Sequence, residues 1–284
     1  IVSQLRHIEQ GEADEKFGAN WIDSYVLKAA QSSEVMFEEL IKKLSTLDDV
    51  YIKDLLFSII YEPEITRRLK LWPAGRSIHH AYQGGLLEHL LSCVHLGLSL
   101  SAHYGVNKNY VVAGCLLHDL CKIFELSDGA LVDYTEEGKL IGHLIKILEV
   151  IDLHAARISH FPKEVKMHLK HIMLSHHGEY EYGSPKIPQT SEAMLVHLID
   201  LMDSKMHSFE AVKKSDKQTG RWSAYVKHLD RVIYKDALPT HLNYSSEEVM
   251  PGPKVEKRAE KSSNSKELKQ SMANLLKDFK VTEE

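Results

Sequence analysis

The sequence has few cysteines and little net charge. Its three cysteines, Cys93, Cys115 and Cys121, are scattered and are too few for a disulfide framework. Each lies in an apolar helical segment, where a free cysteine behaves as a small hydrophobic residue, and this usage is typical of a reducing cytoplasm. The formal net charge of −5 is no overall signature of nucleic-acid binding. It argues only weakly against binding of a long duplex, since a local basic groove remains compatible with it.

Long hydrophobic runs are also missing. No apolar run approaches the roughly 18 residues of a membrane span, and we find no signal peptide, so the sequence predicts a cytoplasmic location without membrane contact. The chain starts at Ile1 rather than Met, as expected for a fragment or a processed form. With 284 residues, 43% of them hydrophobic, a domain with a sizeable core is expected.

Composition and periodicity divide the chain into three parts. Residues 1–20 are polar and predict an arm or the remnant of a missing domain. Residues 21–245 carry apolar residues three and four positions apart in successive segments, which predicts an almost all-α domain. Residues 246–284 are rich in Lys, Glu and Ser and predict a disordered tail, in which residues 271–281 have the pattern of a short amphipathic helix.

Helix boundaries in the middle part are predicted from Pro, Gly and capping residues. An Asp128-Gly129 turn predicts one small hairpin. Thr135 is expected to cap the helix that carries His143, and Thr190 or Ser191 the helix that carries Asp200. The helices are expected at about residues 21–44, 50–69, 80–103, 110–124, 135 onward, 162–177, 190 onward and 219–234.

The eighteen histidines are the most unusual feature. Five histidines and two aspartates lie in apolar helical sequence, where burying a charged group without a partner is costly. Imidazole and carboxylate are ligands of borderline and hard divalent cations, so these residues predict a metal centre. They are His89, His118, Asp119, His143, His176, His177 and Asp200. Nine others are expected at the surface or at helix ends, namely His7, His95, His103, His154, His160, His168, His207, His228 and His241.

The order of the ligands suggests two cations that share Asp119. We expect one cation to be bound by His89, His118, Asp119 and Asp200, and the other by Asp119, His143, His176 and His177. Two ions about 3.5–4 Å apart can clamp an in-line displacement at phosphorus, and bound water then has its pKa lowered toward about 7. Alternatives remain at single positions, because His143 also fits a core histidine and His176 or His177 also fits a helix C-terminus.

Two charged residues near the ligands predict catalytic roles besides that of Asp119. Lys122 follows Asp119 by three residues, on nearly the same face of the predicted helix, where it would neutralise a phosphate oxygen. Asp203 lies one turn beyond Asp200, where it would orient a ligating histidine or the bound water. The alternatives are an exposed helix lysine for Lys122 and a solvent-facing carboxylate for Asp203.

The order His89, His118-Asp119, Asp200 resembles that of the HD-domain metal-dependent phosphohydrolases. The resemblance narrows to the YhaM-type 3′→5′ exoribonucleases over about residues 25–215. The segments that carry it are HHAYQGGLLEHLLS, GCLLHDLCKIFELS, YTEEGKLIGHL and LSHHGEYEYGSPKIPQTSEAMLVHLIDLMDSK. It implies an HD-domain helical bundle that uses divalent metal, typically Mn²⁺, to trim RNA or single-stranded DNA from the 3′ end.

The chain departs from that family's pattern in two ways. The family carries an N-terminal OB-fold domain that grips single strands, whereas only about twenty residues precede the helical region here, too few for a five-stranded barrel. Leu120-Cys121 replaces the Ile-Gly that usually precedes the lysine, which should alter packing rather than ligation.

Further residues are predicted to contact the substrate. In the resembling family the pair His79-His80 lies at the entry to the metal-bearing helix, which places it near the substrate phosphate as donors, with a helix N-terminal cap as the alternative. Arg76 and Lys186 are weaker candidates for phosphate contacts. Tyr182, with its neighbour Tyr180, would stack on a base as aromatic residues do in single-strand binders, and an ordinary core or surface tyrosine is the alternative.

The hypothesis from the sequence is a divalent-metal-dependent phosphodiesterase that acts as a 3′→5′ exonuclease on single-stranded RNA or DNA. Mn²⁺ is the favoured cofactor, and Fe²⁺, Mg²⁺ and Ni²⁺ also suit mixed nitrogen and oxygen ligands. One alternative is an HD-type phosphohydrolase of mononucleotides or signalling nucleotides. Another is a non-catalytic, metal-bound binding module. Homo-oligomerisation is left open.

Overall fold

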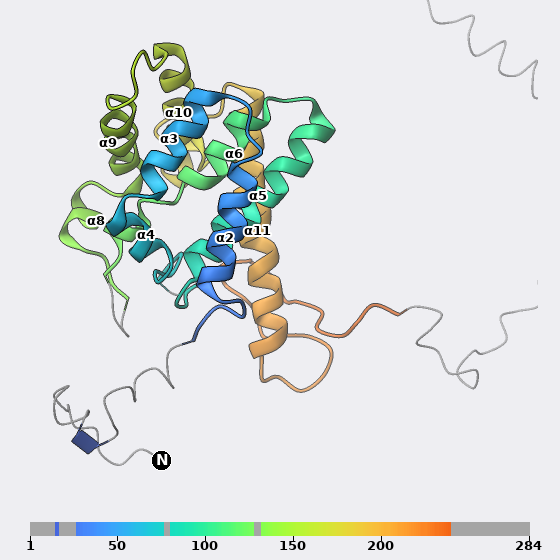
Figure 1. Ribbon diagram of the computed structural model, residues 1–284. Coiled ribbons are helices and arrows are strands. Elements are labelled where there is room, and N and C mark those ends of the chain that lie inside the picture. Colours follow the sequence, from blue (N-terminus) through green and yellow to red (C-terminus); the bar gives the residue numbers. More distant parts are fainter. Residues whose placement is uncertain (1–14, 17–26, 77–79, 128–131, 240–284) are drawn as a thin grey trace, which may run out of the picture. The chain divides into compact units, whose positions relative to one another are not determined.

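The computed structural model of the chain describes residues 15–16, 27–76, 80–127 and 132–239. Helices make up almost all of the regular structure in these ranges, and β-pairing there is limited to isolated bridges, so the predicted all-α class is confirmed (Figure 1). The helices are α2 (Ser33–Leu44), α3 (Val50–Ile60), α4 (Pro63–Leu69), α5 (Gly85–Tyr104), α6 (Lys108–Leu117), α7 (Lys122–Glu125), α8 (Glu136–Leu140), α9 (His143–Ala155), α10 (Lys163–Ser175) and α11 (Ser191–Ser215), with a 3₁₀ turn at Tyr180–Tyr182.

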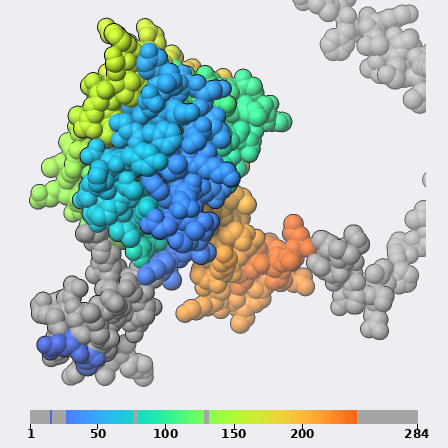
Figure 2. Space-filling view, viewed as in Figure 1, coloured from blue at the N-terminus to red at the C-terminus, as the bar shows by residue number. Residues whose placement is uncertain are grey.

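The core forms around α5 and α6. Helix α5 packs against α2, α6 and α11, and α6 also contacts α3, α10 and α11. Helices α2, α3 and α4 cover one face of this core, and they form most of the surface that is visible in blue and cyan in Figure 2. Helices α5, α6, α10 and α11, which carry or directly precede most of the predicted ligands, therefore meet in this core.

A glycine allows α6 to approach its neighbours closely. A Cβ atom at Gly114 would lie 2.5 Å from Val196 Cγ2 on α11 and 2.9 Å from Ile172 Cγ2 on α10. Real Cβ atoms do not approach other carbons so closely, because interiors are already close-packed. Because Gly114 has no side chain, the C-terminal end of α6 can pack closely against α10 and α11.

Helix α5 is long and apolar enough to cross a membrane by length and composition alone, with a mean hydropathy of 1.2 in its best window. The sequence prediction that no segment reaches such a length is therefore wrong. In the folded chain 56% of that window is buried, and the helix packs against three others in the core. Core helices of globular bundles have the same character.

Several predicted helices begin later or end earlier than expected. The predicted helix 21–44 begins only at Ser33 within the described residues. The predicted helix 50–69 divides before Pro63, because proline lacks the N–H that would continue the α3 ladder. The predicted helix 80–103 begins only at Gly85, after His80 and Gly84 adopt positive φ values of 47° and 77°.

Two further predicted helices are interrupted beside the ligands. The predicted helix 110–124 ends at Leu117, and His118–Cys121 form a turn before α7. Thr135 caps α8 through a bond from the Gly138 N–H, but α8 stops before Gly142, whose φ of 74° and ψ of 163° are not helical. His143 therefore begins a separate helix. Helices α10 and α11 agree with their predictions, and Thr190 caps α11.

The predicted helix at 219–234 is wrong. Backbone bridges join Trp222 to Tyr234 and Val226 to Arg231, and Asp230 has a φ of 54°. Aromatic and β-branched residues favour such extended pairing over a helix. Leu126 and Tyr134 form an antiparallel bridge where a hairpin was predicted, and the Asp128-Gly129 turn itself lies outside the described residues.

The predicted arm at 1–20, apart from residues 15–16, and the predicted tail at 246–284 also lie outside the described residues. Contacts group Ile1–Lys235 as one unit and Asp236–Glu284 as another. The three-part division of the chain stays a prediction.

Candidate metal centre

The fold brings the seven predicted ligands together in its interior. His89 comes from α5, His118 and Asp119 from the turn after α6, and His143 from the first residue of α9. His176 and His177 follow α10 directly, and Asp200 lies in α11. Side chains of His89, His118 and His176 are fully buried, and Asp119 is 3% exposed.

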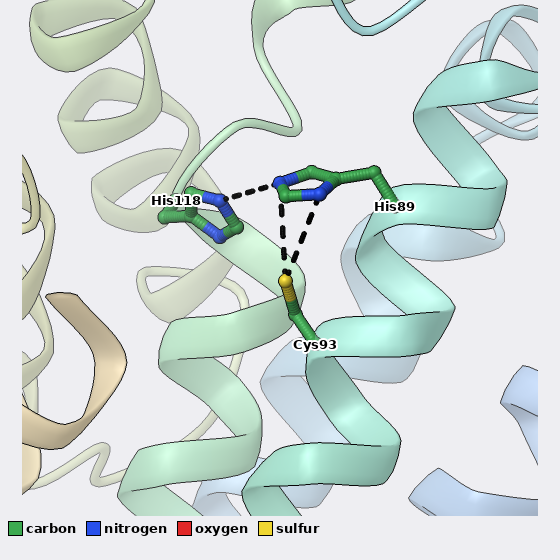
Figure 3. Close-up of side chains that lie close together, drawn as sticks. All are labelled: His89, Cys93 and His118. Carbon is green, nitrogen blue, oxygen red and sulfur yellow. Dashed lines mark hydrogen bonds between the residues drawn. The ribbon is translucent and has the colours of Figure 1, made fainter. Parts of the chain in front are cut away.

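Four of these residues form a first group. His89 Nε2 lies 3.2 Å from His118 Nε2. Asp200 Oδ1 lies 3.5 Å from His89 Nε2 and 3.7 Å from His118 Nε2. Asp119 Oδ2 lies 3.7 Å from His89 Nε2 and 3.6 Å from His118 Nε2. Figure 3 shows the His89 ring pointing from α5 toward the His118 ring, with Cys93 one turn below His89. One ligand atom from each residue thus lies within reach of a single cation.

The remaining histidines form a second group on the other side of Asp119. The ring of His176 lies 4.4 Å from that of His177, and the ring of His143 lies 5.5 Å from that of His177. Asp119 Oδ1 is 3.5 Å from His143 Nε2 and 3.9 Å from His176 Nε2. The two oxygens of one carboxylate therefore face different groups of histidines.

Main-chain carbonyls orient three of the rings. His118 Nδ1 donates to the carbonyl of Cys115 over 3.0 Å, and His176 Nδ1 donates to that of Met173 over 2.8 Å. Both acceptors lie three residues back, in the last turn of a helix, where carbonyls lack a helical partner. His177 Nδ1 donates to the carbonyl of Tyr182 over 3.1 Å. A proton held on Nδ1 leaves the lone pair on Nε2, as a metal ligand requires.

Carboxylates orient the other two rings. His89 Nδ1 donates to Asp203 Oδ2 over 2.7 Å, and the Ser92 hydroxyl donates to the other oxygen of Asp203. His143 donates to Glu125 Oε2 with both its ring Nδ1–H and its backbone N–H, the latter over 2.8 Å. Such a carboxylate partner is typical of metal-ligating histidines because it fixes the tautomer and raises basicity.

The residues fit a divalent cation. The Nε2 atoms of His143 and His176 are buried and have no hydrogen-bond partner among the described residues, and an unpaired buried polar atom is costly. Burial lowers the pKa of His176 well below its usual value and also lowers the pKa of His177. Both rings are therefore neutral at pH 7, which is the ligand form.

The charged residues around Asp119 and His89 favour a bound cation. Burial would raise the pKa of Asp119, but Lys122, His118 and His143 hold it well below its usual value. The Lys122 Nζ lies 2.6 Å from Asp119 Oδ2, and although burial opposes its charge, this contact raises its pKa. Burial also opposes protonation of His89, yet the carboxylates of Asp200 and Asp203 raise its pKa well above the usual value. A cation would supply that positive charge in place of the proton.

Cysteine in the cluster remains a thiol. Cys93 Sγ lies 3.8 Å from both ring nitrogens of His89, and burial raises the pKa of Cys93 to about 11. Burial also raises the pKa values of Cys115 and Cys121. All three are buried, as expected for core residues.

The residues that were predicted to contact the substrate do not all lie beside the metal cluster. Arg76 forms an exposed ion pair with Asp133 at 3.4 Å instead of joining the cluster. Tyr182 is 66% exposed, so its ring lies on the surface, and its carbonyl accepts a bond from His177 of the second group. Lys186 is exposed, and its backbone N–H donates to Leu174 at the end of α10. His79 lies outside the described residues.

His80, which the sequence predicts as a phosphate donor, is packed inside the protein. It is 4% exposed, with Nδ1 lying 3.1 Å from Glu88 Oε2 and Nε2 lying 3.3 Å from Asp203 Oδ2. Its ring nitrogens therefore face protein carboxylates and not solvent. Two histidines expected at the surface are also packed: His154 is 2% exposed and bonds to Ser58, and His207 stacks on His80 at 3.7 Å.

Several residues of the site were missed from the sequence. Glu125 has only one signal, its place six residues after Asp119 in the helical segment that carries the ligands. Ser92 follows His89 by three residues and so shares its helix face. The carbonyls of Cys115 and Met173 have no side-chain signature, and only the i−3 spacing from a histidine at a helix end points to them.

Comparison with known proteins matches the HD domain to residues 86–205. Among curated proteins, the 3′-5′ exoribonuclease YhaM of Oceanobacillus iheyensis is 36% identical over 219 residues, which is 75% of this chain and 67% of that protein. The proteins of that name from Listeria monocytogenes serotype 4b and Listeria innocua are 41% identical over 160 residues, which is 56% of this chain and 50% of theirs. No solved structure matches the chain significantly.

The helical bundle and its buried His and Asp residues define an HD-domain protein. Within that class, the chain belongs to the YhaM family, as predicted from its sequence. The matching segment spans between half and two thirds of the length of these relatives.

Proposed function

We propose that the chain is a divalent-metal-dependent phosphodiesterase that removes nucleotides from the 3′ end of single-stranded RNA or DNA. The observation that carries the proposal is the Asp119 carboxylate, whose two oxygens face separate groups of buried ligands. The relatives that match the chain are named 3′-5′ exoribonucleases, which supports RNA as the substrate.

Two cations would share Asp119. His89, His118 and Asp200 would hold one, and His143, His176 and His177 would hold the other, with Mn²⁺ as the favoured metal for mixed nitrogen and oxygen ligands. Cations at such sites polarise phosphoryl oxygens and lower the pKa of bound water toward about 7.

The chain's own residues would hold the reacting groups. Asp119 stays ionised beside Lys122, as the direction of its pKa shift indicates, and so remains a ligand at every pH near neutrality. Lys122 is 16% exposed and keeps its proton. It would therefore stabilise negative charge that develops on the phosphate oxygens. Asp203 would act through His89 by fixing the proton on Nδ1.

Substrate would enter beside the second group. Tyr182 is exposed there and anchored through its carbonyl to His177, so its ring would stack on a nucleobase without sequence preference. Lys186 is exposed on the same loop and would contact a phosphate. Arg76, which pairs with Asp133, would serve only as a more distant phosphate contact.

The proposal is tested with protein that has been stripped of metal by a chelator. A 5′-labelled single-stranded RNA should be shortened stepwise from its 3′ end after Mn²⁺ is returned, and a 3′-blocked strand should resist. Metal content is measured in the same samples by elemental analysis.

Three other results would redirect the proposal. Turnover of mononucleotides or signalling nucleotides without oligonucleotide trimming would favour the second candidate, a small-nucleotide phosphohydrolase. Stoichiometric metal with no hydrolysis of either would favour a binding module. Failure to bind any divalent cation would refute all three. The cytoplasmic location stays a prediction, and homo-oligomerisation stays open.

A further inference from the structure

A second polar cluster lies behind His89, away from the ligands that it faces. It consists of His80 and Tyr82 from the loop before α5, Glu88 from the first turn of α5, and His207 from α11. The Tyr82 hydroxyl lies 3.1 Å from His80 Nδ1 and 3.1 Å from His207 Nε2, and it donates to Glu88. The side chains therefore satisfy one another around a single hydroxyl.

His80 is locked in this cluster by its backbone as well as by its ring. Its φ of 47° lies in the left-handed region, which non-glycine residues rarely adopt without support from their surroundings. The His80 N–H faces His207 Nδ1 at 3.4 Å, and the His80 carbonyl accepts from Ala74 at 3.1 Å. A Cβ at Gly85 would lie 2.1 Å from that carbonyl oxygen, so only glycine permits the loop to pack on α5 here.

The cluster reaches the metal centre through Asp203. The oxygen of Asp203 that accepts from His89 Nδ1 at 2.7 Å also lies 3.3 Å from His80 Nε2. His80 Nε2 is buried and forms no hydrogen bond with any described residue, so its influence on that oxygen comes from the close contact itself. Asp203 thus accepts hydrogen bonds from His89 and from the Ser92 hydroxyl, and His80 packs against the oxygen that His89 binds.

We propose that His80 is a positioning residue for the metal ligand His89. Held by Tyr82, Glu88 and His207, it restrains the Asp203 carboxylate, and that carboxylate keeps the His89 lone pair on Nε2, aimed at the cation. This assignment rests on the proposed metal centre, and it replaces the phosphate-donor role expected from the sequence.

The test measures cation affinity and not only activity. Metal-free protein is titrated with Mn²⁺ for the wild type, His80→Asn, Asp203→Asn and the double variant. Substitution of a residue that hydrogen-bonds to a ligating histidine typically lowers metal affinity by about 10–100-fold. We expect Asp203→Asn to weaken one class of cation sites within that range, and His80→Asn to weaken the same class by about tenfold, at its lower end. The double variant should be no weaker than Asp203→Asn alone, because both act through one carboxylate.

His160→Asn is the matched control. His160 also has a positive φ, 56°, but is exposed, so the same substitution there should leave Mn²⁺ affinity unchanged. Asn tolerates the left-handed region better than most residues, and Tyr82→Phe, which removes only the central hydroxyl, provides a second variant should His80→Asn fail to fold. Tyr82→Phe should weaken the same class of sites by less than His80→Asn does.

Two outcomes would overturn the proposal. One is additive losses in the double variant, which would mean that His80 acts independently of Asp203. The other is unchanged Mn²⁺ affinity with a raised KM for the oligonucleotide, which would return His80 to substrate binding. Wild-type protein that binds Mn²⁺ but trims no RNA would refute the exonuclease while leaving the role of His80 intact.

Discussion

At the scale of single residues, Asp119 is the carboxylate that faces both groups of histidines. Asp119→Asn keeps the volume but removes the charge and one acceptor oxygen. We expect loss of at least one cation per chain, measured by elemental analysis. RNA trimming should slow by about 10²-fold or more, since removing one group that stabilises transition-state charge has that effect.

The control for this change is Asp152→Asn. Asp152 lies on α9, is about half exposed and pairs with Lys166 at 3.2 Å and with Lys170. Its loss should alter neither metal content nor rate, because surface ion pairs contribute little. If Asp119→Asn trimmed RNA at a near-native rate after chelation and return of Mn²⁺, the shared-carboxylate arrangement would be wrong.

Glu125 is the residue whose effect is least expected from the sequence. Its carboxylate accepts both N–H groups of His143, and Glu125→Gln leaves only one acceptor oxygen and adds a competing donor. Cation affinity should fall about 10–100-fold in Mn²⁺ titrations of metal-free protein. Glu137→Gln, which affects an exposed pair with Lys146 at 2.6 Å, should show no change.

At the scale of elements, the end of α6 decides the geometry of the site. Helical periodicity continues through Leu120 and Ile123, which are buried just as Leu116 is, so nothing in the apolar pattern marks the stop at Leu117. In the turn, bonds such as Lys122 N–H to Asp119 O, at 3.0 Å, replace the helical ladder. This turn allows His118 and Asp119 to face the same cluster, although adjacent positions on a helix point about 100° apart.

The packing of α6 offers a test at this scale. Gly114→Ala would push α6 from α10 and α11, because its Cβ would overlap Val196 and Ile172. We expect the free energy of unfolding to fall by about 1–3 kcal/mol, the typical cost of overpacking, as measured by urea denaturation. Mn²⁺ affinity should fall as well, since His118 would move relative to His176 and Asp200.

Gly97→Ala is the graded control for the same kind of change. Its Cβ would lie 3.2 Å from Cys115 Sγ and 3.3 Å from Val111 Cγ1, which is tight but does not overlap, and it affects only the contact of α5 with α6. A loss of stability larger than that of Gly114→Ala would contradict the role given to the close approach of α6.

At the scale of the whole molecule, buried histidines should make the stability of the metal-free chain depend on pH. Burial lowers the pKa values of His154 and His176, whereas in the unfolded chain they lie near 6.5. Below pH 6.5 the unfolded chain therefore binds protons that the folded chain does not. The free energy of unfolding should then fall as the pH falls, by at most about 1.4 kcal/mol per pH unit for each such group.

His89 acts in the opposite sense, because its pKa is raised in the folded chain. Its contribution is complete below about pH 6.5 and is lost as the pH rises toward its folded value. Urea denaturation between about pH 5.5 and 8 should thus find the metal-free chain most stable near pH 6.5. Saturating Mn²⁺ should remove the decline above that pH, since the cation replaces the proton. A free energy of unfolding that kept increasing as the pH was lowered below about 6 would contradict these opposed contributions.

The sequence by itself determined the family, the all-α class and the residues that make up the buried cluster of histidines and aspartates. Cations of this kind accept only a few residue types, so His118-Asp119, His143 and Asp200 in apolar sequence indicated metal binding directly. Helices α10 and α11 were also predictable, because Pro162 and Thr190 mark their starts. These signals are local, and a sequence contains them without any knowledge of the fold.

Only the tertiary structure decided which atoms of those residues meet. The carbonyls of Cys115 and Met173, the Glu125 carboxylate and the position of His80 behind Asp203 determine where each imidazole lone pair points. The apolar pattern reports which side of a segment is buried, but not where its helix stops. Neither does it report what a nitrogen faces across several helices, because that depends on backbone geometry and packing between segments distant in the chain.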